Sequence, residues 1–126
     1  MLSFQLAESL GGKTFEAFLL LYNRHMLSNK DARIARKVKR RLLEITPVKR
    51  VVVYGSRARG DATKYSDLDL YIEVLAQVDR TLRQEIREIA WEVSLDSGVV
   101  ISTLVGGERL KGQPILKAIE KEVIAV

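Results

Sequence analysis

The spacing of apolar residues predicts two helices in the first third of the chain. A first helix is predicted over residues 13–27, where apolar side chains recur every three or four positions. A second is predicted over residues 29–45, with Ser28 or Asn29 as its cap, and Pro47 ends it because the residue before proline avoids helical geometry. The apolar stripe of this second helix consists of Ile34, Val38, Leu42 and Ile45.

The remaining chain alternates short apolar runs with helical patterns. Residues 49–54, 68–74 and 99–105 predict three strands, and a turn or short helix at residues 56–60 joins the first two. Residues 79–95 predict a helix, and another is predicted to begin at Pro114 and run to about residue 122. Residues 123–126 predict a short edge strand. This order predicts an α/β (α+β) domain: a small mixed β-sheet with helices packed on one face, formed by residues 47–126, with residues 1–46 as an N-terminal helical extension packed on the same domain.

Composition excludes several classes of site. The 126 residues contain no cysteine and one histidine, His25, so disulfides, thiolate metal sites and histidine-rich zinc sites are ruled out. The longest apolar cluster is far shorter than the roughly 20 residues that cross a bilayer. No signal peptide is evident at the N-terminus. We therefore expect a cytoplasmic protein that makes no membrane contact.

The chain is basic, with a net charge of +5, which attracts polyanions without selecting one. Much of this charge falls on the second predicted helix, in Lys30, Arg33, Arg36, Lys37, Lys39, Arg40 and Arg41. The pattern fits a solvated polar face, or else a docking stripe for RNA or an acidic protein. No aromatic residue is interleaved, which weakens a role in stacking on single strands. Nucleic-acid binding therefore has only charge in its favour.

A phosphate-binding turn is predicted where the first strand ends. Gly55 has no Cβ and lets the backbone approach a ligand closely. The N–H groups that follow favour an anion, the Ser56 hydroxyl can donate to a phosphate oxygen, and the Arg57 guanidinium matches phosphate geometry. Taken alone, the same residues are more simply those of an ordinary turn with a capping serine.

A metal-binding pair is predicted where the second strand begins. Asp67 and Asp69 are two residues apart, so in a strand they share a face and their Cα atoms lie about 7 Å apart. Leu68, Leu70 and Ile72 then point the other way, which predicts a sheet with one packed face and one open face. Adjacent carboxylates repel one another, and hard oxygen ligands suit Mg²⁺ or Mn²⁺. An isolated Asp-x-Asp would also fit turn chemistry.

The two elements together form a recognisable pattern. Gly55-Ser56, ten further residues and then Asp67-Leu68-Asp69 resemble the motif of the DNA polymerase β-like nucleotidyltransferase superfamily, and Ala58-Arg59-Gly60 and Ser66 resemble its minimal nucleotidyltransferases. The resemblance implies that Gly55, Ser56 and Arg57 hold a triphosphate, with ATP as the expected nucleotide, and that Asp67 and Asp69 are catalytic metal ligands. It implies transfer of a nucleoside monophosphate, AMP by expectation, to an acceptor hydroxyl, with release of pyrophosphate. It also implies a helical HEPN-type protein as partner, with this chain as antitoxin.

One departure from the family pattern leaves catalysis open. The family places a third carboxylate on a neighbouring strand, where it helps to deprotonate the acceptor. Residues 99–105 contain no acid, and Ser102 is predicted to occupy the matching place. Glu73 shares the face of the aspartates but lies about 13 Å along the strand from Asp69. Asp96 and Glu108 flank the third strand, and both are more simply turn or surface residues. We expect an enzyme, with a catalytically inactive nucleotide-binding subunit as the alternative; a homo-oligomer is compatible with both.

Overall fold

The computed structural model describes residues 27–106 and 124–126 of the chain. Its elements follow one another as α3 (Asn29–Leu43), β1 (Val48–Tyr54), α4 (Ser56–Arg59), β2 (Leu68–Val74), α5 (Arg80–Ser97), β3 (Ile101–Val105) and β4 (Ile124–Ala125). Each predicted element inside these ranges is present, within a few residues of its expected bounds. The helices predicted at residues 13–27, apart from Leu27, and 114–122 lie outside the described residues.

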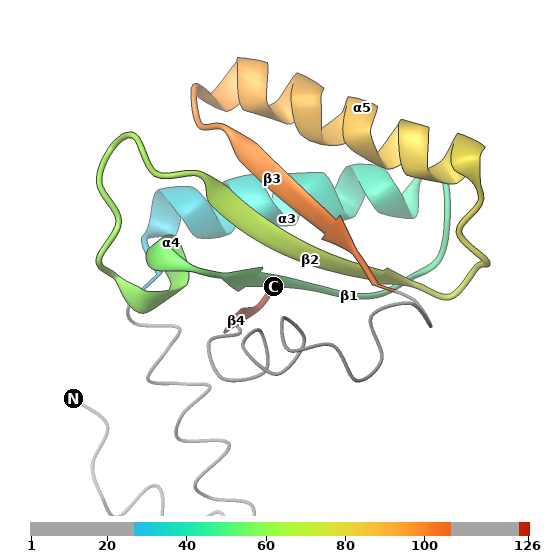
Figure 1. Cartoon of the computed structure of the whole chain (residues 1–126), viewed down its shortest axis with the longest axis horizontal. Helices are drawn as coiled ribbons and strands as arrows, with labels where there is room; N and C mark the ends of the chain where they lie inside the picture. The colour runs from blue at the N-terminus through green and yellow to red at the C-terminus, as the bar shows by residue number, and fades with distance from the viewer. Residues whose placement is uncertain (1–26, 107–123) are drawn as a thin grey trace, which may run out of the picture.

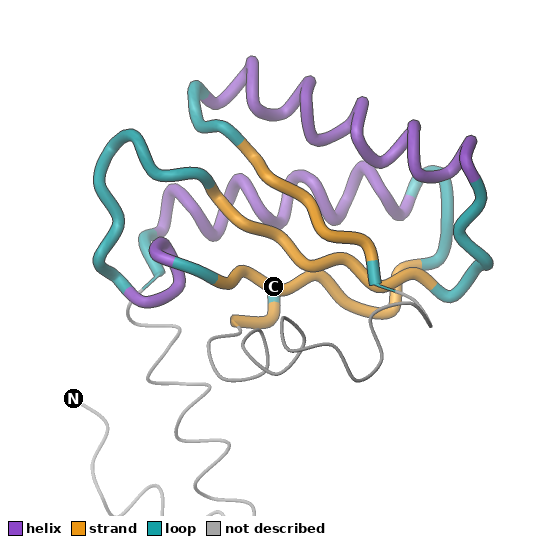
Figure 2. The backbone as a smooth tube through the Cα atoms, viewed as in Figure 1, coloured by secondary structure: helices purple, strands orange, loops and turns teal. Residues whose placement is uncertain are grey.

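The strands form one mixed sheet in the order β3-β2-β1-β4. β1 runs antiparallel to both β2 and β4, whereas β2 and β3 are parallel and are joined by the crossover helix α5. Figures 1 and 2 show α3 and α5 side by side over one face of this sheet. The predicted fold class is therefore confirmed, including the edge strand at the C-terminal end.

The main core lies between this helical layer and the sheet. Leu68, Leu70 and Ile72 of β2 are fully buried, as their alternation predicts, and they pack with Val38 and Leu42 of α3. These and the other apolar side chains between the layers form one cluster, so α3 shares its core with the sheet. The assignment of residues 1–46 as an extension stays a prediction, but its last helix is built into this domain.

The apolar stripe of α3 is shorter than predicted. Ile45 is 43% exposed, so its place in the stripe is wrong. The helix ends at Leu43, because the chain must turn before Pro47 to enter β1. Ser28 caps the other end, where its side chain accepts a hydrogen bond from the Asp31 amide at 3.0 Å.

Part of the basic charge on α3 is used inside the fold. Lys37 pairs with Asp96, and Arg41 pairs with Glu92, both on α5. Lys39 Nζ donates to the Val126 carbonyl oxygen at 2.7 Å. These contacts account for three of the seven basic residues, while the other four, Lys30, Arg33, Arg36 and Arg40, are exposed.

The second face of the sheet is not open, contrary to the prediction. Tyr71 of β2 is only 3% exposed and packs with Val52 in a small second cluster. Its hydroxyl donates to Glu73 Oε1 at 2.8 Å, and the Arg50 guanidinium donates to the same oxygen. Burial and this bond to Glu73 raise the pKa of Tyr71 to about 12. An aromatic and charged cluster therefore lies on the face that carries Asp69.

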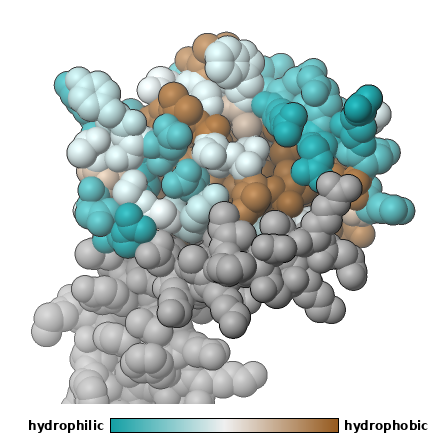
Figure 3. Space-filling model, in the orientation of Figure 1, coloured by the Kyte–Doolittle hydropathy of each residue, from teal (hydrophilic) through white to brown (hydrophobic). Residues whose placement is uncertain are grey.

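The exposed surface is mixed in character. Figure 3 shows hydrophobic patches among hydrophilic side chains on the face it draws. The large hydrophobic residues exposed in the described ranges are Leu43, Ile45, Tyr65, Leu75, Trp91, Leu95 and Val100. Among the helices described, none has the length and apolar character to cross a membrane.

Candidate active site

Gly55 brings the two halves of the sequence motif into contact. It follows β1 with φ 76° and ψ −157°, a backbone region that is essentially reserved for glycine. A Cβ at this position would overlap Asp69 Oδ2 and would lie 3.4 Å from Asp69 Cγ. The absence of a side chain at residue 55 is therefore what lets the Asp69 carboxylate lie against the turn.

Short hydrogen-bonded turns fix Ser56 at the start of α4. The Gly55 carbonyl accepts from the amides of Ala58 and Arg59 at 3.1 and 3.0 Å. The Ser56 carbonyl accepts from the amides of Gly60 and Asp61 at 3.0 and 3.1 Å, and the Ala58 side chain is buried in the core. The main chain that carries the Ser56 hydroxyl is thus held directly beside the end of β1.

Asp69 is the second residue of β2, at the end of the sheet where the motif residues lie. Its Cα partners are Tyr54 on β1 and Ser102 on β3, while Asp67 lies just before β2 and is exposed. Burial and the charge of Asp67 raise the pKa of Asp69, against the opposing effect of Arg59. Burial and the charge of Asp69 likewise raise the pKa of Tyr54. The two aspartates are therefore close enough to repel one another.

This arrangement fits a divalent cation with oxygen ligands. Mg²⁺ is commonly held by one or two carboxylates together with substrate phosphates and water. Among residues 27–106 and 124–126, no group of three or more His, Cys, Asp or Glu side chains could hold a metal ion. Asp67 and Asp69 fit the smaller protein contribution, and phosphate oxygens of a substrate would then complete the coordination. The raised pKa of Asp69 adds a reason, because a cation would relieve the repulsion.

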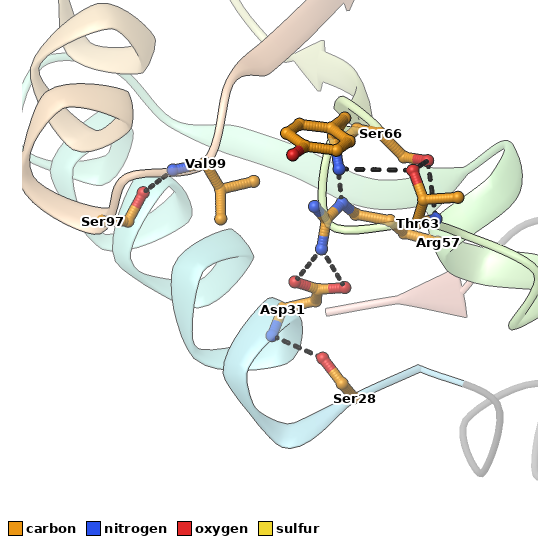
Figure 4. Close-up of polar contacts among 8 residues, drawn as sticks. Ser28, Asp31, Arg57, Thr63, Ser66, Ser97 and Val99 are labelled. Carbon is orange, nitrogen blue, oxygen red and sulfur yellow. Dashed lines mark hydrogen bonds and ion pairs between the residues drawn. The ribbon is translucent and has the colours of Figure 1, made fainter.

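The Arg57 guanidinium, which the sequence predicts to bind phosphate, makes contacts within the protein. Its Nη1 donates to both carboxylate oxygens of Asp31, at 2.9 and 3.1 Å, and its Nε donates to the Ser66 carbonyl oxygen at 2.9 Å. Figure 4 shows this guanidinium between the start of α3 and the loop that leads to β2. The arginine whose charge acts on Asp69 is Arg59, which also donates to Asp61 at 3.2 Å.

The third carboxylate is absent from the place where the family has it. Ser102 is the β3 residue in register with Asp69, as predicted. Glu73 cannot replace it, because Arg50, Lys49 and Tyr71 all bind its carboxylate. Asp96 is on α5, on the opposite side of the sheet, and pairs with Lys37, and Glu108 lies outside the described residues.

Comparison with known proteins identifies this arrangement. Residues 35–125 match the nucleotidyltransferase domain family. The chain belongs to this family. The resemblance to the minimal nucleotidyltransferases of the DNA polymerase β-like superfamily is thereby confirmed, and nucleotidyl transfer is the general chemistry that the family membership supports.

Two relatives extend the comparison. A protein of Methanocaldococcus jannaschii, provisionally named a protein adenylyltransferase, is 30% identical over 77 residues, which are 61% of this chain and 72% of that protein. The crystal structure of a toxin–antitoxin with AMP-PNP has a similar fold, with a TM-score of 0.53 and 15% identity, over 78% of this chain and 72% of the other. The second likeness concerns the fold alone.

Two residues near the site were not singled out from the sequence. Asp31 looked like one acid on a basic helix, and its burial at 4% exposure depends on a partner 26 residues away. Tyr54 looked like the last apolar residue of a strand, and only the β1–β2 register places it opposite Asp69. The position of Tyr54 directly before Gly55 could have indicated it, and Ser28 and Asp31 have the spacing of a helix cap. Neither local pattern predicts the contact of Asp31 with Arg57.

Proposed function

We propose that this protein transfers AMP from Mg·ATP to a hydroxyl group of an acceptor and releases pyrophosphate. The observation that carries the proposal is the contact of Asp69 with Gly55, which unites the metal and phosphate halves of the motif. Membership of the nucleotidyltransferase family supports it. A protein is the acceptor class that the adenylyltransferase relative favours.

Each residue has a defined part in this proposal. Gly55 and Ser56 bind the β- and γ-phosphates, through backbone amides and the hydroxyl, while Asp67 and Asp69 hold Mg²⁺ or Mn²⁺. The bound cation supplies neutralising charge to the triphosphate. The acceptor oxygen then bonds to the α-phosphorus, the bond to the pyrophosphate oxygen breaks, and the hydroxyl proton passes to solvent.

The test is transfer of label from α-labelled ATP, with pyrophosphate release measured in parallel. Asp67→Asn and Asp69→Asn should each abolish both signals, because each removes a ligand charge from the cation. Asp96→Asn is the matched control, since it removes the same charge from an exposed ion pair on the helical face. Transfer that survives Asp69→Asn would contradict the assignment.

A second candidate is a nucleotide-binding subunit that does not turn over. It is favoured by one observation: Ser102, rather than a carboxylate, is the residue in register with Asp69. A serine hydroxyl is a poor base at neutral pH. This candidate predicts metal-dependent nucleotide binding without pyrophosphate release under any acceptor condition.

Ser102→Asp separates the two candidates. It places a carboxylate opposite Asp69 and would complete the family pattern. If the wild-type protein only binds nucleotide, this variant should gain pyrophosphate release. If the wild-type protein is already a full enzyme with a base elsewhere, the added charge should leave turnover unchanged or lower it.

An antitoxin role is compatible with both candidates. The structural neighbour is a toxin–antitoxin, and the sequence motif resembles antitoxins that act beside helical HEPN-type proteins. The four exposed basic residues of α3 give a surface that suits an acidic partner. Co-purification of one such helical protein with the wild-type chain, and its loss when these four residues are changed to glutamine, would support this role. If that variant still co-purifies with the partner, the basic face of α3 is not the docking surface.

A further inference from the structure

A buried ion pair lies beside the candidate site in the described part of the chain. Through one further hydrogen bond it connects three separate segments. The side chains of Arg57 and Asp31 are 11% and 6% exposed, whereas those of the two ion pairs that join α3 to α5 are 35–67% exposed. Arg57 belongs to α4, Asp31 to the first turn of α3, and the Ser66 carbonyl to the loop before β2. One guanidinium therefore holds the phosphate turn, the aspartate loop and the helical layer together.

Both ends of this connection are themselves held. Asp31 lies in the first turn of α3, where its amide donates to Ser28 Oγ, and α3 is anchored in the core by Val38 and Leu42. Three hydrogen bonds join Ser66 to Thr63: Ser66 N donates to the Thr63 carbonyl at 3.1 Å, Thr63 N donates to Ser66 Oγ at 2.9 Å, and the two hydroxyls lie 3.4 Å apart. The guanidinium thus connects two ordered supports.

We propose that Arg57 and Asp31 form a clamp that positions the loop carrying Asp67 against the turn carrying Ser56. Ser66 is the residue directly before Asp67, and Arg57 is the residue directly after Ser56. In this role Arg57 acts through the Ser66 carbonyl and is a positioning residue, in place of the phosphate ligand expected from sequence. Asp31 precedes residues 35–125, the part that matches the family, so the clamp reaches beyond that match.

The chemistry of the guanidinium suits this function. Its planar array of donors satisfies a carboxylate and a carbonyl at once, whereas a lysine ammonium is a single point that cannot reproduce that fork. Loss of the Asp31 charge would leave a buried cation without its counter-charge, which is strongly unfavourable. The guanidinium would then move away from the Ser66 carbonyl, and the loop that carries Asp67 would no longer be held in place against the turn that carries Ser56.

The effect of the clamp on nucleotide affinity rests on the proposed function, and a binding titration tests that effect. The dissociation constants of Mg²⁺ complexes of ATP, GTP, CTP and UTP are measured by calorimetry for wild type, Asp31→Asn and Arg57→Lys. The control is Asp96→Asn, which breaks the exposed ion pair between Asp96 of α5 and Lys37 of α3. The clamp predicts binding weakened about tenfold or more by Asp31→Asn, a loss of about 1.4 kcal/mol, and unchanged binding for the control.

The opposite result would identify Arg57 as a phosphate ligand. If Arg57 binds phosphate directly, Asp31→Asn frees its charge and leaves nucleotide affinity unchanged or improved. Arg57→Lys keeps the positive charge but loses the fork, so it should weaken binding under either role, and the distinction rests on Asp31→Asn. Nucleotide affinity near the wild-type value in either folded variant overturns the clamp.

Hydrogen exchange gives a second measurement that does not depend on nucleotide. In the ligand-free protein, Asp31→Asn should raise the exchange of amides in residues 61–67 at least about tenfold over wild type, as expected for local opening. Exchange in α5 should stay as in wild type. Equal protection of residues 61–67 in both proteins would overturn the clamp. If the wild-type protein binds none of the four nucleotides, the proposed function is wrong, but hydrogen exchange still tests the clamp. If Asp31→Asn does not fold, Asp31→Glu and Arg57→Lys replace it in the same measurement.

Discussion

Substitution of Gly55 by alanine tests the contact on which the candidate site depends. The residue has φ 76° and ψ −157°, and its missing Cβ leaves room for the Asp69 carboxylate. Holding alanine in this backbone region costs about 1–3 kcal/mol. The overlap with Asp69 adds about 1–3 kcal/mol, the usual cost of overpacking. Alanine also restricts the unfolded chain, which returns about 0.4–1 kcal/mol.

The balance predicts that Gly55→Ala lowers the free energy of unfolding by about 3 kcal/mol. Gly98→Ala is the matched control, because Gly98 has φ 75° and a Cβ there would meet nothing within 4 Å. That control contains only the strain of a left-handed backbone, about 1–2 kcal/mol. Urea unfolding with a constant m value measures both.

A double-mutant cycle with Asp69→Ala separates the steric part from the backbone part. Without the carboxylate, Gly55→Ala should cost about as much as Gly98→Ala, so the interaction energy of the cycle should be about 1–3 kcal/mol. Nucleotide affinity should fall in Gly55→Ala and stay unchanged in Gly98→Ala. Equal costs for the two glycines, or an interaction energy near zero, would refute the contact between Gly55 and Asp69.

Three further predictions concern other parts of the structure. Burial and a neighbouring carboxylate raise the pKa of Asp69 above 3.8, so the protonated form stabilises the fold and this contribution is lost as pH rises through the folded pKa. In metal-free buffer, the free energy of unfolding of the wild-type protein, measured with urea, should therefore decline as pH rises through this pKa, and Asp69→Asn should abolish that decline. The same pH profile in both proteins would contradict the raised pKa of Asp69. Burial and a hydrogen-bonded carboxylate raise the pKa of Tyr71 to about 12. The contribution of protonated Tyr71 to the free energy of unfolding is therefore lost as pH rises above about 10, the pKa of tyrosine in the unfolded chain. Tyr71→Phe should remove the highest step of the tyrosine absorbance titration. Persistence of that step would assign it to another tyrosine. Leu42→Ala should lower the free energy of unfolding by about 2–5 kcal/mol, because the side chain is fully buried, whereas Ile45→Ala, at 43% exposure, should cost under about 0.5 kcal/mol. Similar costs for these two would contradict the role of α3 in the core.

The local elements could be predicted because their causes are local. The alternation of β2 and the Ser28 cap of α3 each act over a few residues, and the structure has both where expected. Ile45 was assigned to the buried stripe because periodicity continues to it, but the turn into β1 takes it out of the helix. Helical spacing by itself does not state where a tertiary turn must begin.

The sequence by itself determined the chemistry available at the site. Gly55, Ser56, Asp67 and Asp69 have the types and spacing of a phosphate turn and a cation pair, and β3 has no carboxylate to add. Those statements need only side-chain identity and strand periodicity.

Only the tertiary structure decided how these groups are held. It placed Ser102 and Tyr54 opposite Asp69, since strand register depends on the packing of whole strands. It also paired the buried Arg57 guanidinium with Asp31, because a buried guanidinium requires a counter-charge. The motif therefore gives the candidate reacting groups, while Asp31, a residue outside the motif and 26 positions from Arg57, binds the Arg57 guanidinium.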